Sequence, residues 1–258
     1  MMLKKGRGGV LDLRGFFSKY PKVALAFSGG VDSAYLLSEA VDHAKEVRAY
    51  YVKTIFQPDF ELEDAQRLAG DLKADLKVIS LDLTGEEEIL SNPSNRCYYC
   101  KKKIFSTIQK EAALDGFSVL LDGTNASDRV DDRPGMKVLN ELHVLSPLRL
   151  CGLTKEDIRH RSKEKGLFTW NKPAYACLAT RISPGQRIQA EDLRQTEIAE
   201  DYLFQLGFSD FRVRNLDGKA KLELREEDLP RLLAHREDII EELEKSYQAV
   251  YLDLEVRK

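Results

Sequence analysis

Short apolar runs alternate with amphipathic stretches along the first two thirds of the chain. Continuous or alternating apolar runs indicate strands, and apolar residues spaced three to four apart indicate helices. The predicted strands occupy 22–27, 46–54, 74–83 and 117–125. The predicted helices occupy 10–19, 34–44, 59–74, 95–116 and 153–167. Strands and helices that alternate in this way are typical of a parallel sheet with right-handed crossovers.

The last part of the chain has a different pattern. It predicts a helix at 190–208, a hairpin at 210–224 with its turn at Asp217–Gly218, a helical stretch at 225–247 divided at Pro230, and a strand at 248–256. Residues 168–188, rich in turn residues, are predicted to be a linker that also contributes to a site. We therefore predict an α/β fold, with a Rossmann-like parallel-sheet domain over 1–180 and a small α+β domain over 181–258.

Charge and hydropathy exclude several classes of protein. Lys and Arg number 40 against 43 Asp and Glu, so the net charge of −3 predicts no long-range attraction to nucleic acid. No apolar run reaches the roughly 18 residues that cross a bilayer. The N-terminal residues have positive charge but lack the apolar core and cleavage site of a secretory leader. We therefore expect a cytoplasmic protein.

The strongest motif is Ser28–Ser33, SGGVDS, between a predicted strand and a predicted helix. Its glycines allow a sharp turn that exposes backbone N–H groups, and the start of a helix attracts anions such as phosphate. Asp32 is placed to hold Mg²⁺ against a polyphosphate. An ordinary strand–helix turn is the alternative interpretation, because Ser, Gly and Asp are common turn residues. The motif is neither a Walker A loop nor GxGxxG.

Four cysteines suggest a second centre of chemistry. Cys97 and Cys100 have the C-x-x-C spacing that favours metal or redox chemistry in an intracellular chain, where a disulfide framework is not expected. A zinc site with a fourth ligand, a redox dithiol, and unligated thiols beside an independently acting Cys177 all stay open. Cys151 is interpreted as a small buried apolar residue.

These motifs resemble those of a known superfamily and of one family within it. SGGVDS resembles the PP-loop of the N-type ATP pyrophosphatases, and DGTNASD at 122–128 resembles their second nucleotide-site segment. NRCYYCK at 95–101, KPAYACLATRI at 172–182 and FRVR at 211–214 resemble the LarE family of ATP-dependent sulfur transferases. The resemblance covers nearly the whole chain and includes the small C-terminal domain.

The resemblance implies a reaction and its cofactors. LarE enzymes act in nickel-pincer nucleotide biosynthesis, which matures lactate racemase. A carboxylate of pyridinium-3,5-biscarboxylic acid mononucleotide is adenylated by ATP and Mg²⁺, and sulfur then replaces AMP to give a thiocarboxylate. In one branch three cysteines, here Cys97, Cys100 and Cys177, hold a [4Fe-4S] cluster whose open iron carries the sulfur. In the other branch Cys177 alone is the sacrificial sulfur donor.

The resemblance also implies roles for individual residues. The expected ATP-binding residues are Ala26, Ser28, Gly29, Gly30, Asp32, Ser33, Lys53 and Gly123. Arg212 and Arg214 lie two apart on a predicted strand and so share one face, where guanidinium groups suit a substrate phosphate; a solvated strand face is the alternative. Arg181 is expected at the adenylate or the substrate. Glu200 is a substrate-binding candidate, with a surface carboxylate as the alternative.

Three other functions remain to be separated from this one. A tRNA thiolase would share the PP-loop and a three-cysteine cluster, but should have a basic surface or additional zinc-binding cysteines. An ammonia-using synthetase does not explain the cysteines, and a nucleotide-binding regulator does not need them. We expect a small-molecule nucleotide as substrate, no nucleic-acid or membrane partner, and a homo-oligomer. We also expect Cys97 and Cys177 to converge in the fold.

Overall fold

The structure is a computed structural model that describes residues 12–128 and 134–257. The N-terminal residues, including the first two of the helix predicted at 10–19, lie outside the described ranges. The chain forms two compact units, each assembled from separate stretches of sequence. The first comprises 1–52, 60–80 and 101–172, and the second comprises 53–59, 81–100 and 173–258. These units differ in their bounds from the two predicted domains, 1–180 and 181–258, which stay a prediction.

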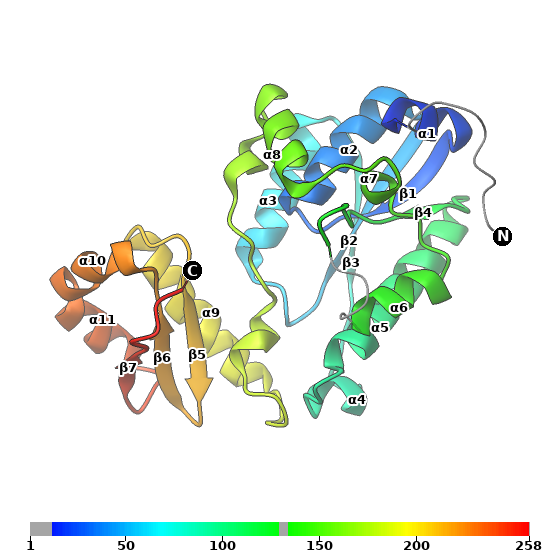
Figure 1. Cartoon of the computed structure of the whole chain (residues 1–258). Helices are drawn as coiled ribbons and strands as arrows, with labels where there is room; N and C mark the ends of the chain where they lie inside the picture. The colour runs from blue at the N-terminus through cyan, green and yellow to red at the C-terminus, as the bar shows by residue number, and fades with distance from the viewer. Residues whose placement is uncertain (1–11, 129–133, 258) are drawn as a thin grey trace. The chain divides into compact units, whose positions relative to one another are not determined.

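The first unit contains a four-stranded sheet of order β3-β2-β1-β4, in which β1 pairs in parallel with both β2 and β4 (Figure 1). Its strands are β1 (Lys22–Ala26), β2 (Glu46–Lys53), β3 (Asp75–Ser80) and β4 (Leu120–Leu121). The helices of this part of the chain are α1 (Leu13–Lys19), α2 (Val31–His43), α3 (Asp59–Asp71), α5 (Arg96–Leu114), α6 (Pro134–Glu141), α7 (Pro147–Leu150), α8 (Lys155–Glu164) and the 3₁₀ helix η1 (Phe168–Asn171). The predicted α/β class is confirmed.

Burial explains why the first strand is a continuous apolar run. Val23, Ala24 and Leu25 of β1 are fully buried, as expected for a central parallel strand covered on both faces. The apolar positions of α2 pack into the same core. Cys151 also packs against this core, and burial raises the pKa of its thiol to about 11, in agreement with its interpretation as an apolar residue.

The second unit contains a three-stranded sheet of order β5-β6-β7 (Figure 1). β5 and β6 are antiparallel and joined by the predicted turn, where Asp217 and Gly218 have φ of 50° and 79°. β7 pairs in parallel with β6. The elements of this part are α4 (Glu87–Leu90), the 3₁₀ helix η2 (Leu178–Arg181), α9 (Ala190–Gln205), β5 (Arg212–Leu216), β6 (Lys219–Glu223), the 3₁₀ helix η3 (Glu226–Asp228), α10 (Leu229–Ala234), α11 (Arg236–Leu243) and β7 (Val250–Leu252).

A separate apolar cluster explains why the second unit draws in earlier segments of the chain. Phe56, Leu83 and Leu178 are fully buried in it, together with Ile182. The second half of the predicted linker is therefore a packed part of this unit. The cluster brings residues near Cys177 together with those that precede Cys97 in the sequence.

The remaining differences from the sequence predictions have local causes. Only two residues of the strand predicted at 117–125 pair in the sheet, and α6 and α7 were not predicted. The helical stretch at 225–247 divides at His235 and not at Pro230, because proline is tolerated in the first turn of α10. In the described ranges, no helix is long and apolar enough to cross a membrane.

Candidate active site

The SGGVDS motif forms a tight loop between β1 and α2 in the first unit. Gly29 has φ of 70°, and a Cβ there would lie 3.3 Å from both the Ala65 Cβ and the Glu61 carbonyl oxygen. Gly30 is the N-cap of α2 and offers no side-chain atom to bond the first N–H groups of the helix. The hydroxyl of Ser33 donates to the Gly30 carbonyl at 3.1 Å. The loop thus presents backbone donors at a helix start, the arrangement that suits phosphate.

Asp32 lies in the first turn of α2 with its two carboxylate oxygens in different surroundings. Oδ2 is 2.6 Å from the Lys155 ammonium. Oδ1 is buried and accepts no hydrogen bond from any described residue. A buried, unpartnered carboxylate oxygen beside a phosphate-binding loop fits a Mg²⁺ ligand, because Mg²⁺ prefers oxygen donors and bridges carboxylates to phosphates.

The DGTN segment lies against this loop. A Cβ on Gly123 would be 3.0 Å from the backbone nitrogen of Ser33, so any larger residue would push the segment and the loop apart. Beside it, Asp122 accepts hydrogen bonds from the hydroxyls of Ser146, at 2.5 Å, and Thr124. Burial raises the pKa of the Asp122 carboxyl. The segment therefore closes one side of the loop with a fixed, buried carboxyl group.

Ala26 and Lys53, also predicted to bind ATP, lie outside the SGGVDS loop. Ala26 is the last residue of β1 and pairs in register with Tyr50 of β2. Lys53 ends β2 but belongs to the second unit, where its ammonium pairs with Asp59 at 2.7 Å and also donates to the Gln57 carbonyl. Ala26 thus lies just before the loop, whereas Lys53 lies at the boundary between the units and its ammonium is engaged by residues that follow β2.

The predicted cysteines of the second centre all belong to the second unit. Cys97 is exposed and Cys100 partly buried, and they lie one turn apart near the start of α5. Cys177 is the N-cap of η2. Burial raises the pKa of the Cys177 thiol, the nearby Arg96 guanidinium opposes that rise, and the charge of Cys97 adds to it. All three thiols belong to the second unit, and the close approach of Cys97 and Cys177 stays a prediction.

The donor chemistry of these thiols suits an iron–sulfur cluster, since two lie one helical turn apart on α5 and the third belongs to the same unit. The described residues nevertheless contain no group of three or more His, Cys, Asp or Glu side chains already arranged around a metal.

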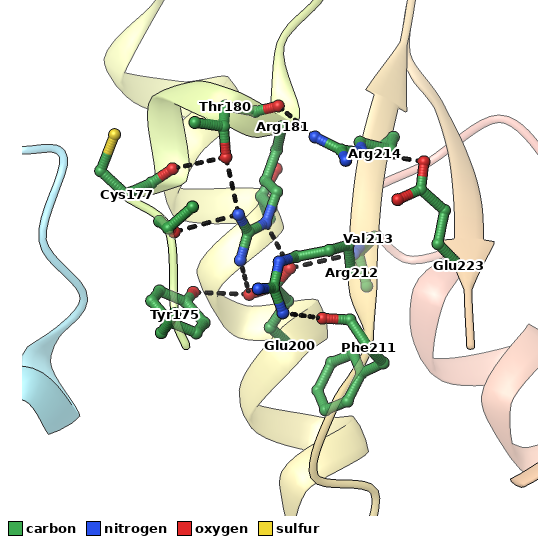
Figure 2. Close-up of polar contacts among 12 residues, drawn as sticks. Tyr175, Cys177, Thr180, Arg181, Glu200, Phe211, Arg212, Val213, Arg214 and Glu223 are labelled. Carbon is green, nitrogen blue, oxygen red and sulfur yellow. Dashed lines mark hydrogen bonds and ion pairs between the residues drawn. The ribbon is translucent and has the colours of Figure 1, made fainter. Parts of the chain in front are cut away.

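Residues 173–182, which we call the cysteine segment, are held by arginines through their carbonyl oxygens. Arg96 donates to the Ala179 oxygen at 2.8 Å, and Arg181 to the Ala176 oxygen at 3.0 Å. Arg212 donates to the Ala174 oxygen at 2.7 Å, and Arg214 donates to the Thr180 oxygen. In Figure 2 the Cys177 sulfur points away from the network of Arg181, Arg212 and Arg214. The backbone is therefore fixed while the sulfur is left outside the labelled network.

Arg181 and Glu200 form a buried two-pronged ion pair within this network (Figure 2). Their nitrogen–oxygen distances are 2.7 and 3.0 Å, and each residue is only 1 % exposed. Glu200 also accepts from the Tyr175 hydroxyl at 2.5 Å and the Val213 amide at 2.9 Å. The alternative that Glu200 is a surface carboxylate is wrong. The pair is sealed inside the unit, so its geometry favours a positioning role over contact with a substrate.

Arg212 and Arg214 both reach the cysteine segment, so they share one face of β5 as expected. Arg212 is only 7 % exposed. Burial, together with repulsion from Arg181 and Arg257, lowers the pKa of Arg212 to about 10. Arg214 is better compensated, with Nε 2.9 Å from a Glu223 oxygen. The alternative of a solvated strand face does not fit Arg212.

Comparison of the sequence with those of known proteins identifies the family of this chain. No family model matches the chain. The pyridinium-3,5-bisthiocarboxylic acid mononucleotide synthase of Lactiplantibacillus plantarum is 33 % identical over 236 residues, which cover 90 % of this chain and 86 % of that protein. The chain belongs to the LarE family. An uncharacterised protein of Synechocystis sp. is 34 % identical over 220 residues, covering 84 % of this chain and 82 % of that protein.

A more distant match connects this LarE-family chain to the wider PP-loop superfamily. The tRNA-specific 2-thiouridylase of Pseudothermotoga lettingae is 26 % identical over 189 residues, covering 58 % of this chain and 54 % of that protein. The chain thus spans about half the length of the thiouridylase. The family and superfamily predicted from the motifs are confirmed, and the chain is an enzyme of the sulfur-transferase class.

Three residues of these sites were not assigned roles from the sequence of this LarE-family chain. Lys155 pairs with Asp32, Asp122 supports the second nucleotide segment, and Arg96 contacts the cysteine segment. Asp122 and Arg96 lie inside the quoted motifs, so their position gave a usable signal. Lys155 follows Thr154, the N-cap of α8, which forms a capping box with Asp157, but nothing local connects Lys155 to a loop more than a hundred residues earlier.

Proposed function

We propose that this enzyme adenylates a carboxylate of pyridinium-3,5-biscarboxylic acid mononucleotide and inserts sulfur to form a thiocarboxylate for the nickel-pincer nucleotide. The observation that carries the proposal is the cysteine segment, in which four arginines fix the backbone around one cysteine. Support comes from the relative whose name is the bisthiocarboxylic acid mononucleotide synthase. The negative net charge favours a small nucleotide over tRNA as the substrate.

The ATP half of the reaction is assigned to the SGGVDS loop. Its backbone donors and the start of α2 would bind phosphate oxygens, and Asp32, whose Oδ1 is otherwise unpartnered, would hold Mg²⁺. Lys155, now paired with Asp32, supplies a further positive charge. A substrate carboxylate oxygen attacks the α-phosphorus of ATP, and pyrophosphate leaves with the electrons of the broken P–O bond.

The sulfur half is assigned to the cysteines. A sulfur nucleophile attacks the acyl carbon of the adenylate, and AMP leaves with the electrons of the broken C–O bond. We propose that Cys97, Cys100 and Cys177 hold a [4Fe-4S] cluster, which would supply an open iron that carries the sulfur. The alternative is that Cys177 gives up its own sulfur and becomes dehydroalanine.

The substrate phosphate is assigned to Arg212 and Arg214. Arg212 is a buried cation with a lowered pKa, so an anion beside it would offset unfavourable burial and repulsion. Arg181 and Glu200 take part by fixing the cysteine segment and β5. The homo-oligomer expected from the sequence stays a prediction, which light scattering can test.

The test measures pyrophosphate release and the mass of the nucleotide product with anaerobic protein, ATP, Mg²⁺ and the biscarboxylic substrate. Wild type should release pyrophosphate and exchange substrate oxygen for sulfur. Asp32→Asn should lose both products, Cys177→Ser only the thiocarboxylate, and the matched control Cys151→Ser neither. Absence of substrate-dependent pyrophosphate release in the wild type contradicts the proposal.

The sulfur carrier is tested separately by iron and acid-labile sulfide analysis. About four irons per chain, lost when any of Cys97, Cys100 or Cys177 is replaced, would support the cluster. If iron is absent after reconstitution and H₂S is lost from the mass of Cys177 during turnover, Cys177 is the sacrificial donor.

A further inference from the structure

Arg96 is a buried cation at the start of α5. It is 6 % exposed, and its Nη1 donates to the Asn92 side-chain oxygen at 2.7 Å and to the Ala179 carbonyl at 2.8 Å. Its guanidinium carbon lies 5.9 Å from the centre of the Phe56 ring. These partners are all neutral, and no carboxylate of the described residues pairs with Arg96. A buried charge without a counter-charge is unfavourable, so this arrangement needs an explanation.

The sulfur of Cys177 faces the other end of this guanidinium. Nη2 of Arg96 lies 4.0 Å from Sγ of Cys177. A cysteine sulfur is negatively charged when it acts as a nucleophile or a metal ligand. It is therefore the group at this place that can supply the missing negative charge.

The other arginines around the cysteine segment differ in this respect. Arg181 is paired with Glu200, and Arg214 with Glu223. Arg212 has Asp210 at 3.8 Å. Each of these cations has a carboxylate partner, whereas Arg96 has the sulfur. The contrast separates Arg96 from the other three arginines of the cysteine segment.

The surroundings of Arg96 fix its direction. Asn92, four residues before it in the connection between α4 and α5, is buried with φ of 53° and donates from Nδ2 to the Ser183 carbonyl at 2.8 Å. The same side chain accepts from Arg96, so it joins the start of α5 to the end of the cysteine segment. A cation held this firmly does not need to reorganise when charge develops beside it.

We propose that Arg96 is the charge partner of the Cys177 sulfur, which it orients and whose negative charge it stabilises during sulfur transfer. The inference rests on the proposed function, in which Cys177 either helps to hold the cluster or gives up its own sulfur, and it applies to both because the sulfur is negatively charged as a ligand and as a nucleophile. The nearly buried guanidinium is suited to the sulfur and not to a bulky substrate.

Alkylation of Cys177 tests the charge without requiring turnover. The full chain, freed of metal with a chelator under anaerobic conditions, is treated with anionic iodoacetate or neutral iodoacetamide, and Cys177 labelling is followed by peptide mass spectrometry. Arg96→Gln should lower the iodoacetate-to-iodoacetamide rate ratio about tenfold, equivalent to about 1.4 kcal/mol. Arg96→Lys should retain most of the wild-type ratio, because it keeps the charge.

Matched controls separate charge from structure. Arg187→Gln removes an exposed cation of the same unit that pairs with Glu87 at 2.5 Å, and should leave the Cys177 ratio unchanged. If Arg96→Gln does not fold, Arg96→Met fills the same space without charge and should show the same loss. An unchanged ratio in the folded, uncharged variant overturns the inference and leaves Arg96 as a backbone support.

A second readout separates this inference from the proposed function. In the sulfur-transfer assay, Arg96→Gln should lower kcat for thiocarboxylate formation at least tenfold with the KM for ATP unchanged, and Arg96→Lys should recover part of it. Inactive wild type with an Arg96-dependent alkylation ratio contradicts the proposed function alone. Active wild type with no such dependence contradicts the inference alone.

Discussion

The phosphate loop and the cysteine segment solve the same problem of fixing an irregular backbone in opposite ways. In the loop, Ser28–Ser33, glycines turn the chain, two N–H groups donate to serine hydroxyls of the loop, and the first turn of α2 offers its N–H groups to a ligand. In the cysteine segment, residues 173–182, arginine side chains from α5, η2 and β5 bond the carbonyl oxygens. The loop thus presents backbone donors to an anion, whereas the segment has its acceptors occupied and presents a side chain.

This difference predicts where each region is sensitive to substitution. The loop depends on backbone conformation and close approach, so added atoms should damage it. The cysteine segment depends on buried charges, so removal of atoms should damage it. An added side chain should therefore matter most in the loop, and a removed charge most in the cysteine segment.

The largest expected loss of stability comes from breaking the buried ion pair of Arg181 and Glu200, which supports the cysteine segment. Arg181→Ala leaves Glu200 buried without its charge partner, which should lower the free energy of unfolding by about 3–5 kcal/mol. Urea denaturation measures this loss. The double variant Arg181→Met with Glu200→Leu should be more stable than Arg181→Ala, because no charge is stranded. If the single variant is as stable as wild type, the pair does not hold the segment.

An added methyl group should damage the phosphate loop by a smaller amount. Gly29→Ala places a side chain at φ of 70° and 3.3 Å from Ala65 Cβ, so the free energy of unfolding should fall by about 1–3 kcal/mol, and ATP binding should weaken. Calorimetry measures both. Gly70→Ala is the matched control, because a Cβ there has no described atom within 4 Å and α3 should become about 0.5–1 kcal/mol more stable. Equal effects at the two glycines would contradict the argument.

The buried carboxyl beside the loop should give a distinctive pH dependence. Because the pKa of Asp122 is raised by burial, the folded protein keeps this proton longer than the unfolded chain does. Its contribution to stability should therefore fall as pH rises from about 4 through the raised pKa. Asp122→Asn should remove that fall in thermal unfolding measured across the acidic range.

Asp115, in the same unit, provides the opposite control. Its hydrogen bond from Lys77 lowers its pKa, so its contribution is present above the ordinary carboxyl range and lost as pH falls through the lowered pKa. Asp115→Asn should remove a loss of stability that occurs as pH falls, whereas Asp122→Asn should remove a loss that occurs as pH rises. Two variants with the same sign would disprove the assignment of Asp122.

The smallest expected effect on stability concerns Lys155. Its ion pair with Asp32 is partly exposed, so Lys155→Ala should change the free energy of unfolding by less than about 1 kcal/mol. The same variant should raise the KM for ATP several-fold, because a positive charge is lost beside the phosphate loop. Lys163→Ala, on the same helix, is the control and should leave the KM unchanged. A large stability loss without a change in KM would make the pair structural.

The sequence by itself determined features whose causes are local. The alternation of strands and helices, the turn at Asp217–Gly218, the cap at Thr154 and the phosphate loop all depend on neighbouring residues. Each follows from backbone preference, periodicity or side-chain length, which a sequence displays directly. The motifs also gave the family, since the residues around Cys177 and Ser28 are characteristic as contiguous strings.

Only the tertiary structure decided which side chains are partners. Glu200 was assigned to substrate or surface because helix periodicity does not reveal that Arg181 meets it in the core. The sequence suggested no role for Arg96. In the folded chain its guanidinium lies beside the Cys177 sulfur, and no carboxylate of the described residues pairs with it. Such contacts join positions tens of residues apart, and their energies depend on burial and on which charge is compensated. Neither quantity exists until the chain has folded.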